Sequence, residues 1–155
     1  TTNTCMSLSN LIFFISCLNE KANSEKIKTT EESISIHYMR PYVQTISYNC
    51  EMINKEALGE DINYKTFSDS ITISKFLNIY KKYEIEPDQD DNINARIRVV
   101  INTSKIKDTL CLGEGFNTFI NGVKYKDNKE MYLFITKLID YENTPRPKKP
   151  WDNKK

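Results

Sequence analysis

Residues suited to catalysis or metal binding are scarce in this sequence. Its 155 residues include a single histidine, His37, and four cysteines that form no Cys-x-x-Cys pair. A zinc site would therefore need carboxylates in place of the usual cysteine and histidine ligands. Any Ser-His or Cys-His pair would have to use His37, which the alternation of residues 33–38 places on the polar face of a strand. We expect no catalytic residue, no metal site and no cofactor.

An excess of charge of one sign is also lacking. The chain has 22 Lys and Arg residues against 21 Asp and Glu, a net charge of +1. Nucleic-acid-binding domains usually carry a strong basic excess, so we expect no nucleic-acid partner. With only 4 Gly, 5 Pro and 39% hydrophobic residues, the composition is typical of a globular chain with enough apolar material for one core.

The chain divides into three parts by composition. Residues 1–32 form an apolar segment followed by a polar tether. Residues 33–141 show the regular apolar patterns of strands and helices, and residues 142–155 are a Pro- and Lys-rich tail expected to be extended. No linker rich in Gly or Ser divides the middle part. We therefore expect residues 33–141 to be a single α+β domain.

Alternating apolar and polar residues predict most strands of this domain. The predicted strands cover residues 33–38, 42–52, 93–102, 105–112, 116–120 and 123–125, with the first two as separate strands or as one bent strand. Asn121-Gly122 predicts a tight hairpin between the last two. Residues 54–70 contain few apolar positions and are predicted to be a loop.

Two segments show helical periodicity instead. Residues 74–83 carry an apolar stripe, with Thr72 or Ser74 as the expected N-cap. Asp127 is expected to cap a second helix, whose apolar face consists of Met131, Phe134, Ile135, Leu138 and Ile139. The resulting order, β-β-α-β-β-β-α, predicts an α+β fold: an antiparallel sheet of about four to five strands with two helices on one face.

The apolar stretch at residues 6–17 is too short to span a bilayer but suits the central part of an export signal. It resembles a bacterial lipoprotein signal, in which Cys17 would be lipidated and Phe14, Ile15 and Ser16 would precede the cleavage point. A lipid on Cys17 would be the only contact with a membrane. The same stretch also fits an amphipathic helix with a stripe of Leu8, Leu11, Ile12, Ile15 and Leu18.

Export would place Cys50 and Cys111 in an oxidising compartment, where they could form a disulfide. Two buried free thiols are the alternative, because free cysteine behaves as a small hydrophobic residue. The tail carries a basic and aromatic group that could dock on an acidic partner: Arg146, Lys148, Lys149 and Trp151. Alternatively, Trp151 folds back onto the domain and the basic residues keep the tail soluble.

Four runs in the second half of the chain resemble small uncharacterised lipoproteins of Bacteroidetes-type bacteria. The runs are Asn94-Ala-Arg-Ile-Arg-Val-Val, Asp108-Thr-Leu-Cys-Leu-Gly113, Asn121-Gly122 and Lys126-Asp-Asn-Lys-Glu130. The resemblance implies two strands, a hairpin and a terminal helix, together with an envelope location. It implies no catalytic residue.

These observations favour a non-enzymatic, exported or envelope-anchored protein that binds a protein partner, as an inhibitor or immunity-type protein does. It would act in the cell envelope, in the periplasm or outside the cell. One alternative is a secreted, host-directed modulator from a parasite or virus, which a glycan on Asn102 of the Asn102-Thr103-Ser104 sequon would support. Another is a small hydrolase or transferase built from carboxylates such as Glu51, Glu114 and Asp140, which a deep pocket with facing carboxylates would favour.

Overall fold

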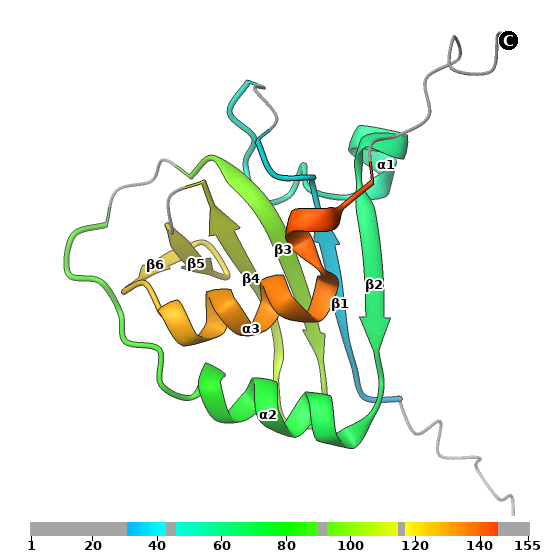
Figure 1. The fold of residues 1–155 in the computed structure, drawn as a ribbon. Coiled ribbons are helices and arrows are strands. Elements are labelled where there is room, and N and C mark those ends of the chain that lie inside the picture. Colours follow the sequence, from blue (N-terminus) through cyan, green and yellow to red (C-terminus); the bar gives the residue numbers. More distant parts are fainter. Residues whose placement is uncertain (1–30, 43–45, 90–92, 115–116, 146–155) are drawn as a thin grey trace, which may run out of the picture.

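Six antiparallel strands form one sheet in the computed structural model, which describes residues 31–42, 46–89, 93–114 and 117–145 (Figure 1). The strands are β1 (Ser33–Tyr38), β2 (Asn63–Phe67), β3 (Ala95–Asn102), β4 (Lys107–Gly113), β5 (Thr118–Ile120) and β6 (Val123–Tyr125). Their order across the sheet is β2-β1-β3-β4-β5-β6. The predicted α+β class is confirmed, and the sheet is slightly larger than expected.

Two helices, α2 (Ser70–Tyr80) and α3 (Lys129–Ile139), cover the same face of the sheet (Figure 1). Alternate residues of a strand point to opposite faces, so β1 and β3 each send one set of side chains toward the helices. The core formed there includes Ile34, Ile36, Val99, Ile101, Leu110, Phe76, Met131 and Ile135, all buried. Three short helical segments complete the described chain: α1 (Lys55–Leu58), η1 (Gly59–Asp61) and η2 (Tyr141–Asn143).

The helix α2 begins earlier than predicted. The side chain of Asp69 accepts a hydrogen bond from the backbone N–H of Thr72 at 2.8 Å, so Asp69 is the N-cap. The prediction of Thr72 or Ser74 as the cap was wrong because the apolar stripe alone does not show where the first turn starts. A carboxylate at this position satisfies an N–H group of the first turn and interacts favourably with the helix dipole.

The N-cap of α3 is also one residue away from the predicted position. The Asn128 side chain accepts a hydrogen bond from the Met131 backbone N–H at 3.1 Å. Asp127 instead accepts a hydrogen bond from the Thr118 hydroxyl at 2.9 Å, which ties the start of α3 to β5. The predicted cap at Asp127 was wrong because this tertiary contact uses its side chain.

The strand predicted at residues 42–52 is absent from the described part of that segment, and β2 lies inside the predicted loop 54–70. The physical reason is that β1 has only two edges. One pairs with β2 and the other with β3. Residues 46–54, which we call the anchored segment, therefore cannot join the sheet beside β1.

The anchored segment packs on the molecule through a second, smaller apolar cluster. The buried members of this cluster are Met39, Ile53, Ile62 and Ala95. The backbone carbonyl of Tyr48 accepts a hydrogen bond from the Ala95 N–H at 2.8 Å, where β3 begins. The segment is thus held at one end of the sheet while it leaves β1 and returns to β2.

Candidate functional site

The face of the sheet opposite α2 and α3, which we call the open face, is polar. Residues in direct register on neighbouring antiparallel strands share a face, so the pairings assign its members. They are Tyr64, Thr66, Ser33, Ser35, His37, Arg98, Val100, Asn102, Lys107, Thr109, Cys111, Phe119 and Lys124. Few of these side chains are apolar, which is consistent with a face that neither α2 nor α3 covers.

His37 lies in the middle of a row of side chains that crosses the open face. Its register partners are Tyr64 on β2 and Arg98 on β3. The rings of His37 and Tyr64 are stacked, with centroids 6.1 Å apart and an angle of 24° between the planes. The only histidine of the chain is thus held between an aromatic ring and a guanidinium group.

The electrostatics of this row favour a neutral histidine. Burial of the imidazole, and then the positive charge of Arg98, lower the pKa of His37. The Nδ1 atom of His37 and the Nε atom of Arg98 are buried and have no hydrogen-bond partner among the described residues. The row therefore presents one positive charge and two unsatisfied nitrogen atoms.

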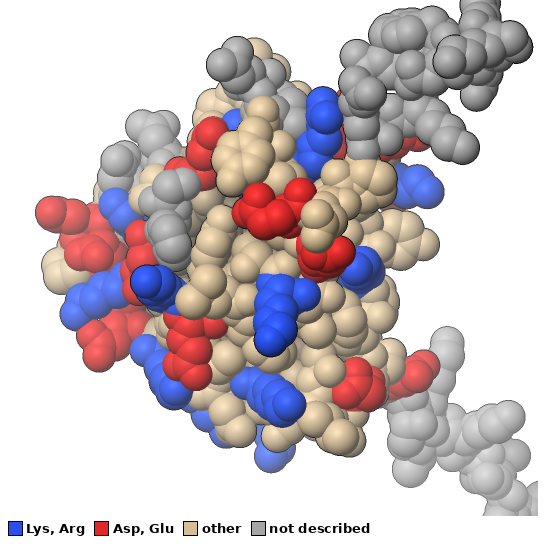
Figure 2. All heavy atoms as spheres, in the orientation of Figure 1, with Lys and Arg blue, Asp and Glu red and all other residues tan. Residues whose placement is uncertain are grey.

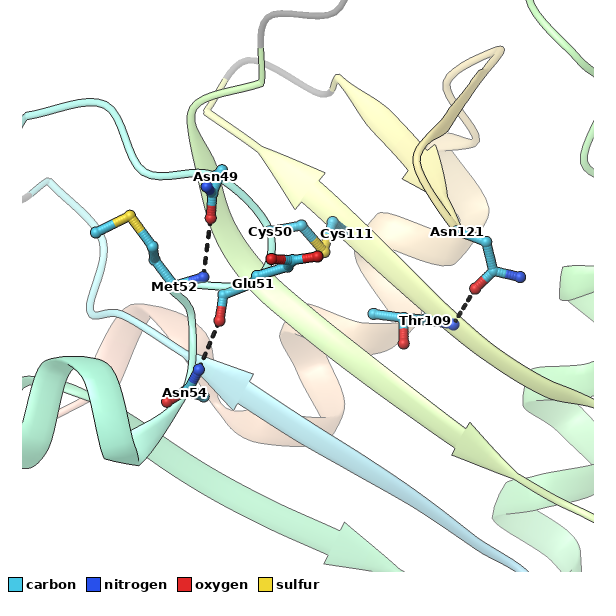
Figure 3. The surroundings of a disulfide bond; sticks show 8 residues. All are labelled: Asn49, Cys50, Glu51, Met52, Asn54, Thr109, Cys111 and Asn121. Atoms are coloured by element: carbon cyan, nitrogen blue, oxygen red, sulfur yellow. Dashed lines mark hydrogen bonds between the residues drawn. A yellow bond between two sulfur atoms is a disulfide. The ribbon is translucent and has the colours of Figure 1, made fainter.

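A disulfide between Cys50 and Cys111 fastens the anchored segment to the open face (Figure 3). Their Cα atoms are 5.8 Å apart, within the usual range for a disulfide. Cys111 is buried in the middle of β4. Of the two alternatives for these cysteines, the structure contains the bridged one.

Local hydrogen bonds fix the turn that carries Cys50. The Asn49 side chain accepts from the Met52 N–H at 3.0 Å, and the Asn54 side-chain amide donates to the Glu51 carbonyl (Figure 3). Asn54 also accepts from the Ala57 N–H at 2.7 Å and caps α1. These bonds present Met52 to solvent and place the Glu51 carboxylate beside the disulfide (Figure 3).

Two shallow hollows run along the open face from the anchored segment. The first, about 340 Å³, is lined by Cys50, Glu51, Arg98, Thr109, Asn121 and Gly122. The second, about 440 Å³, is lined by Ser33, Ser35, Val100, Ile101, Asn102, Lys107, Asp108 and Thr109. Because both include Thr109, we treat them as one polar trough, rich in hydroxyl and amide groups. Their volumes lie in the range of ligand-binding clefts.

The three carboxylates considered for a hydrolytic site are not brought together. Glu51 lines the trough, whereas Glu114 forms an ion pair with Arg96 at 2.8 Å and lines another cavity. Asp140 ends α3 in a left-handed conformation with φ 56°. Across the described ranges, no three His, Cys, Asp or Glu side chains form a group that could hold a metal ion.

Cys17 and the tail group Arg146, Lys148, Lys149 and Trp151 lie outside the described residues. Among the residues that are described, no helix is both long enough and apolar enough to cross a bilayer.

Two residues of the open face were not predicted from the sequence as site residues. Arg98 lies on the polar side of the strand predicted at residues 93–102, so the alternation of that strand could have placed it on the open face. Tyr64 lies in a predicted loop, so no sequence pattern indicated its position.

No protein-family model, curated protein or solved structure matches the chain. The geometry of the open face is therefore the main evidence on function. The predicted resemblance to small envelope lipoproteins stays a prediction.

Proposed function

We propose that the chain is a non-enzymatic, exported protein that binds a protein partner through its open face, as an inhibitor or immunity-type protein does. The observation that carries this proposal is the asymmetry of the sheet. Among the described residues, α2 and α3 cover one face (Figure 1), whereas only the anchored segment and its disulfide cover part of the other. A large exposed surface built on a rigid sheet suits recognition of a partner with little rearrangement.

The disulfide supports the exported part of the proposal. Disulfides form and persist in oxidising compartments such as the periplasm and the outside of the cell, and they are rare in the cytosol. The Cys50–Cys111 bridge joins residues separated by 61 positions, and Cys50 lines one hollow of the trough. Lipidation of Cys17, as the resemblance implies, would attach this domain to the cell envelope through the polar tether.

The edge of the open face has the residue types that carry binding energy in protein interfaces. The Tyr64 side chain is 57% exposed, and Met52 on the anchored segment is also exposed. The Nζ atom of Lys55 lies 5.8 Å from the centroid of the Tyr64 ring. Aromatic residues and methionine are enriched in protein interfaces, so Tyr64 and Met52 are the residues of this surface that we expect to contribute most to binding.

Affinity capture with matched variants tests this proposal. The full chain and its Tyr64→Ala variant are used as bait in extracts of the native source, after both are shown to have the same circular dichroism spectrum. The matched control is Leu133→Ala, because Leu133 is 53% exposed but lies on α3. We expect Tyr64→Ala to lose most of a saturable partner that the wild type and Leu133→Ala retain. Equal capture by both variants would contradict the proposal.

Intact mass spectrometry of the native protein separates the anchored form from the secreted alternative. A diacylglyceryl group on Cys17 supports envelope anchoring, whereas a glycan on Asn102 supports a secreted, host-directed modulator from a parasite or virus. Asn102 is partly buried and lines the trough, so a glycan there would occupy the proposed binding surface. Finding that glycan would therefore contradict a protein interface across this part of the open face.

A further inference from the structure

A small cavity lies away from the open face, where the start of β3 and the end of β4 meet α3 and η2. Its volume is about 120 Å³. We call it the end pocket; its lining includes Tyr42, Arg96, Glu114, Tyr132, Tyr141 and Glu142. A water molecule needs at least about 10–15 Å³ of cavity volume, so the end pocket has room for several water molecules or one small organic group.

The charges of the end pocket favour a positively charged occupant. Arg96 is only 7% exposed, and its Nη2 atom donates to the Glu114 carboxylate at 2.8 Å. The same carboxylate oxygen accepts from the Asn94 side-chain amide at 2.9 Å, so the charge of Arg96 is locally neutralised. Glu142 adds a second carboxylate that pairs with no described cation. Figure 2 shows acidic side chains near the place where α3 ends.

Tyr141 provides a hydroxyl group that no described side chain uses. Its side chain is 6% exposed, and its hydroxyl makes no hydrogen bond with a described residue. The hydroxyl oxygen is not one of the fully buried polar atoms without a partner, so it stays accessible to a ligand in the end pocket, which Tyr141 lines. Burial raises the pKa of Tyr141, which keeps the hydroxyl protonated at neutral pH.

The position of this hydroxyl is fixed by its surroundings. The ring of Tyr141 packs edge-on against Tyr38, with centroids 6.3 Å apart and an angle of 64°. The Thr144 hydroxyl donates to the Tyr141 carbonyl at 2.6 Å, and the Asn143 side chain donates to Asp140 at 2.8 Å. The turn η2 therefore holds Tyr141 and Glu142 in place before any ligand arrives, which is a property of built binding sites.

We propose that the end pocket binds an organic cation, namely a primary ammonium or guanidinium group. The Tyr141 hydroxyl accepts a hydrogen bond from an N–H of the ligand, and the Glu142 carboxylate balances its charge. The aromatic rings of Tyr132 and Tyr141 enclose the alkyl part. The cation is either a free small amine or a basic side chain of another protein. This site does not depend on the function proposed for the open face.

Titrations followed by two-dimensional NMR of the full chain test this proposal. The probes are n-butylammonium for a free amine and Nα-acetyl-lysine methylamide for a protein side chain, with n-butanol and acetate as neutral and anionic controls. We expect saturable shifts of the Gly113 and Glu142 amides with one or both cations only. Tighter binding of the lysine derivative assigns a protein side chain as the source, and equal or tighter binding of n-butylammonium assigns a free amine. No saturable shift with either cation, equal shifts with n-butanol, or saturation with acetate alone would overturn the proposal.

Variants that preserve shape give the second arm of the test. Tyr141→Phe should weaken binding of the cation by about fivefold, the effect of one neutral hydrogen bond. Glu142→Gln should weaken it by about threefold, as expected for an exposed charge. Glu130→Gln, at the other end of α3, serves as the control and should leave binding unchanged. Unchanged affinity in both Tyr141→Phe and Glu142→Gln would overturn the proposal, and amide spectra confirm that each variant is folded.

Discussion

The two faces of the sheet are held by different kinds of interaction. On the helix side, buried isoleucine, valine, leucine and phenylalanine side chains pack in one continuous core. On the open side, the anchored segment is secured by one disulfide and a small apolar cluster, and the surface between is polar. Most of the noncovalent stability therefore comes from the helix side, which leaves the open side free to carry a binding surface.

The strongest test of this contrast removes the covalent link on the open side. The double variant Cys50→Ala/Cys111→Ala should lower the free energy of unfolding by up to about 4 kcal/mol, because the bridge closes a loop between residues 61 positions apart. Urea denaturation measures the change. Dithiothreitol should reproduce the loss in the wild type and have no effect on the variant. A wild type that is equally stable in both conditions would show that the bridge does not hold the anchored segment.

A pair of neighbouring residues on β3 compares the two faces directly. Val99 is fully buried on the helix side, whereas Val100 lies on the open face. Val99→Ala should cost about 2 kcal/mol, since it removes two buried methyl groups and leaves a small cavity. Val100→Ala should cost less than about 1 kcal/mol, mainly through the lower strand preference of alanine. Thermal denaturation of both variants checks the difference. Equal losses of stability would contradict a sheet in which only the helix side is packed in an apolar core.

Acid should destabilise the open face through His37. Because burial and Arg98 lower the pKa of His37 in the folded protein, the unfolded chain binds more protons as the pH falls below the ordinary value of about 6.5. The free energy of unfolding should therefore decrease on acidification, by at most about 1.4 kcal/mol per pH unit, the limit for one group.

The matched variant for this prediction is His37→Gln, which keeps a polar side chain of similar size. Its unfolding free energy should depend less on pH than that of the wild type between about pH 5.5 and 7, the window in which histidine titrates. Urea denaturation at several pH values in both proteins measures the two slopes. Identical slopes would show that His37 is as solvated in the folded state as in the unfolded one.

The smallest effect is expected on the outer surface of the helix side. Lys82 and Glu130 form an ion pair at 2.7 Å between the residues after α2 and the first turn of α3, and both side chains are exposed. Basic and acidic side chains are interspersed over this face (Figure 2). Glu130→Gln should change the unfolding free energy by less than about 0.5 kcal/mol, because exposed pairs are well screened. A loss above about 1 kcal/mol in urea denaturation would show that this ion pair contributes more to stability than an exposed pair is expected to.

The sequence predicted the helix side better than the open side. Alternation in residues 33–38 and 93–102, and the apolar stripe from Met131 to Ile139, were sufficient for the strands and helices that build the core. Each of these patterns is local, because one periodic segment buries one face. The strand β2 was missed because its five residues form an edge and bury little, so Tyr64 and its neighbours lack the apolar alternation of a strand.

The open face depends on relations that no local pattern contains. Cys50 and Cys111 were each assigned to strands, and whether they form a bridge depended on where the chain places residues 61 positions apart. The anchored segment has strand-like composition, but both edges of β1 are already paired. The trough and the end pocket likewise combine residues from several elements, so only the folded chain shows them.

Site-specific photocrosslinking tests most directly whether the open face is the binding surface. A benzophenone amino acid replaces Met52 on the anchored segment in one sample and Leu133 on α3 in another, both exposed positions. The two proteins are irradiated in extracts of the native source and analysed by mass spectrometry. We predict a defined protein adduct from position 52 and none from position 133. An adduct from position 133 alone, or from neither position, would contradict the proposal that a protein partner binds the open face.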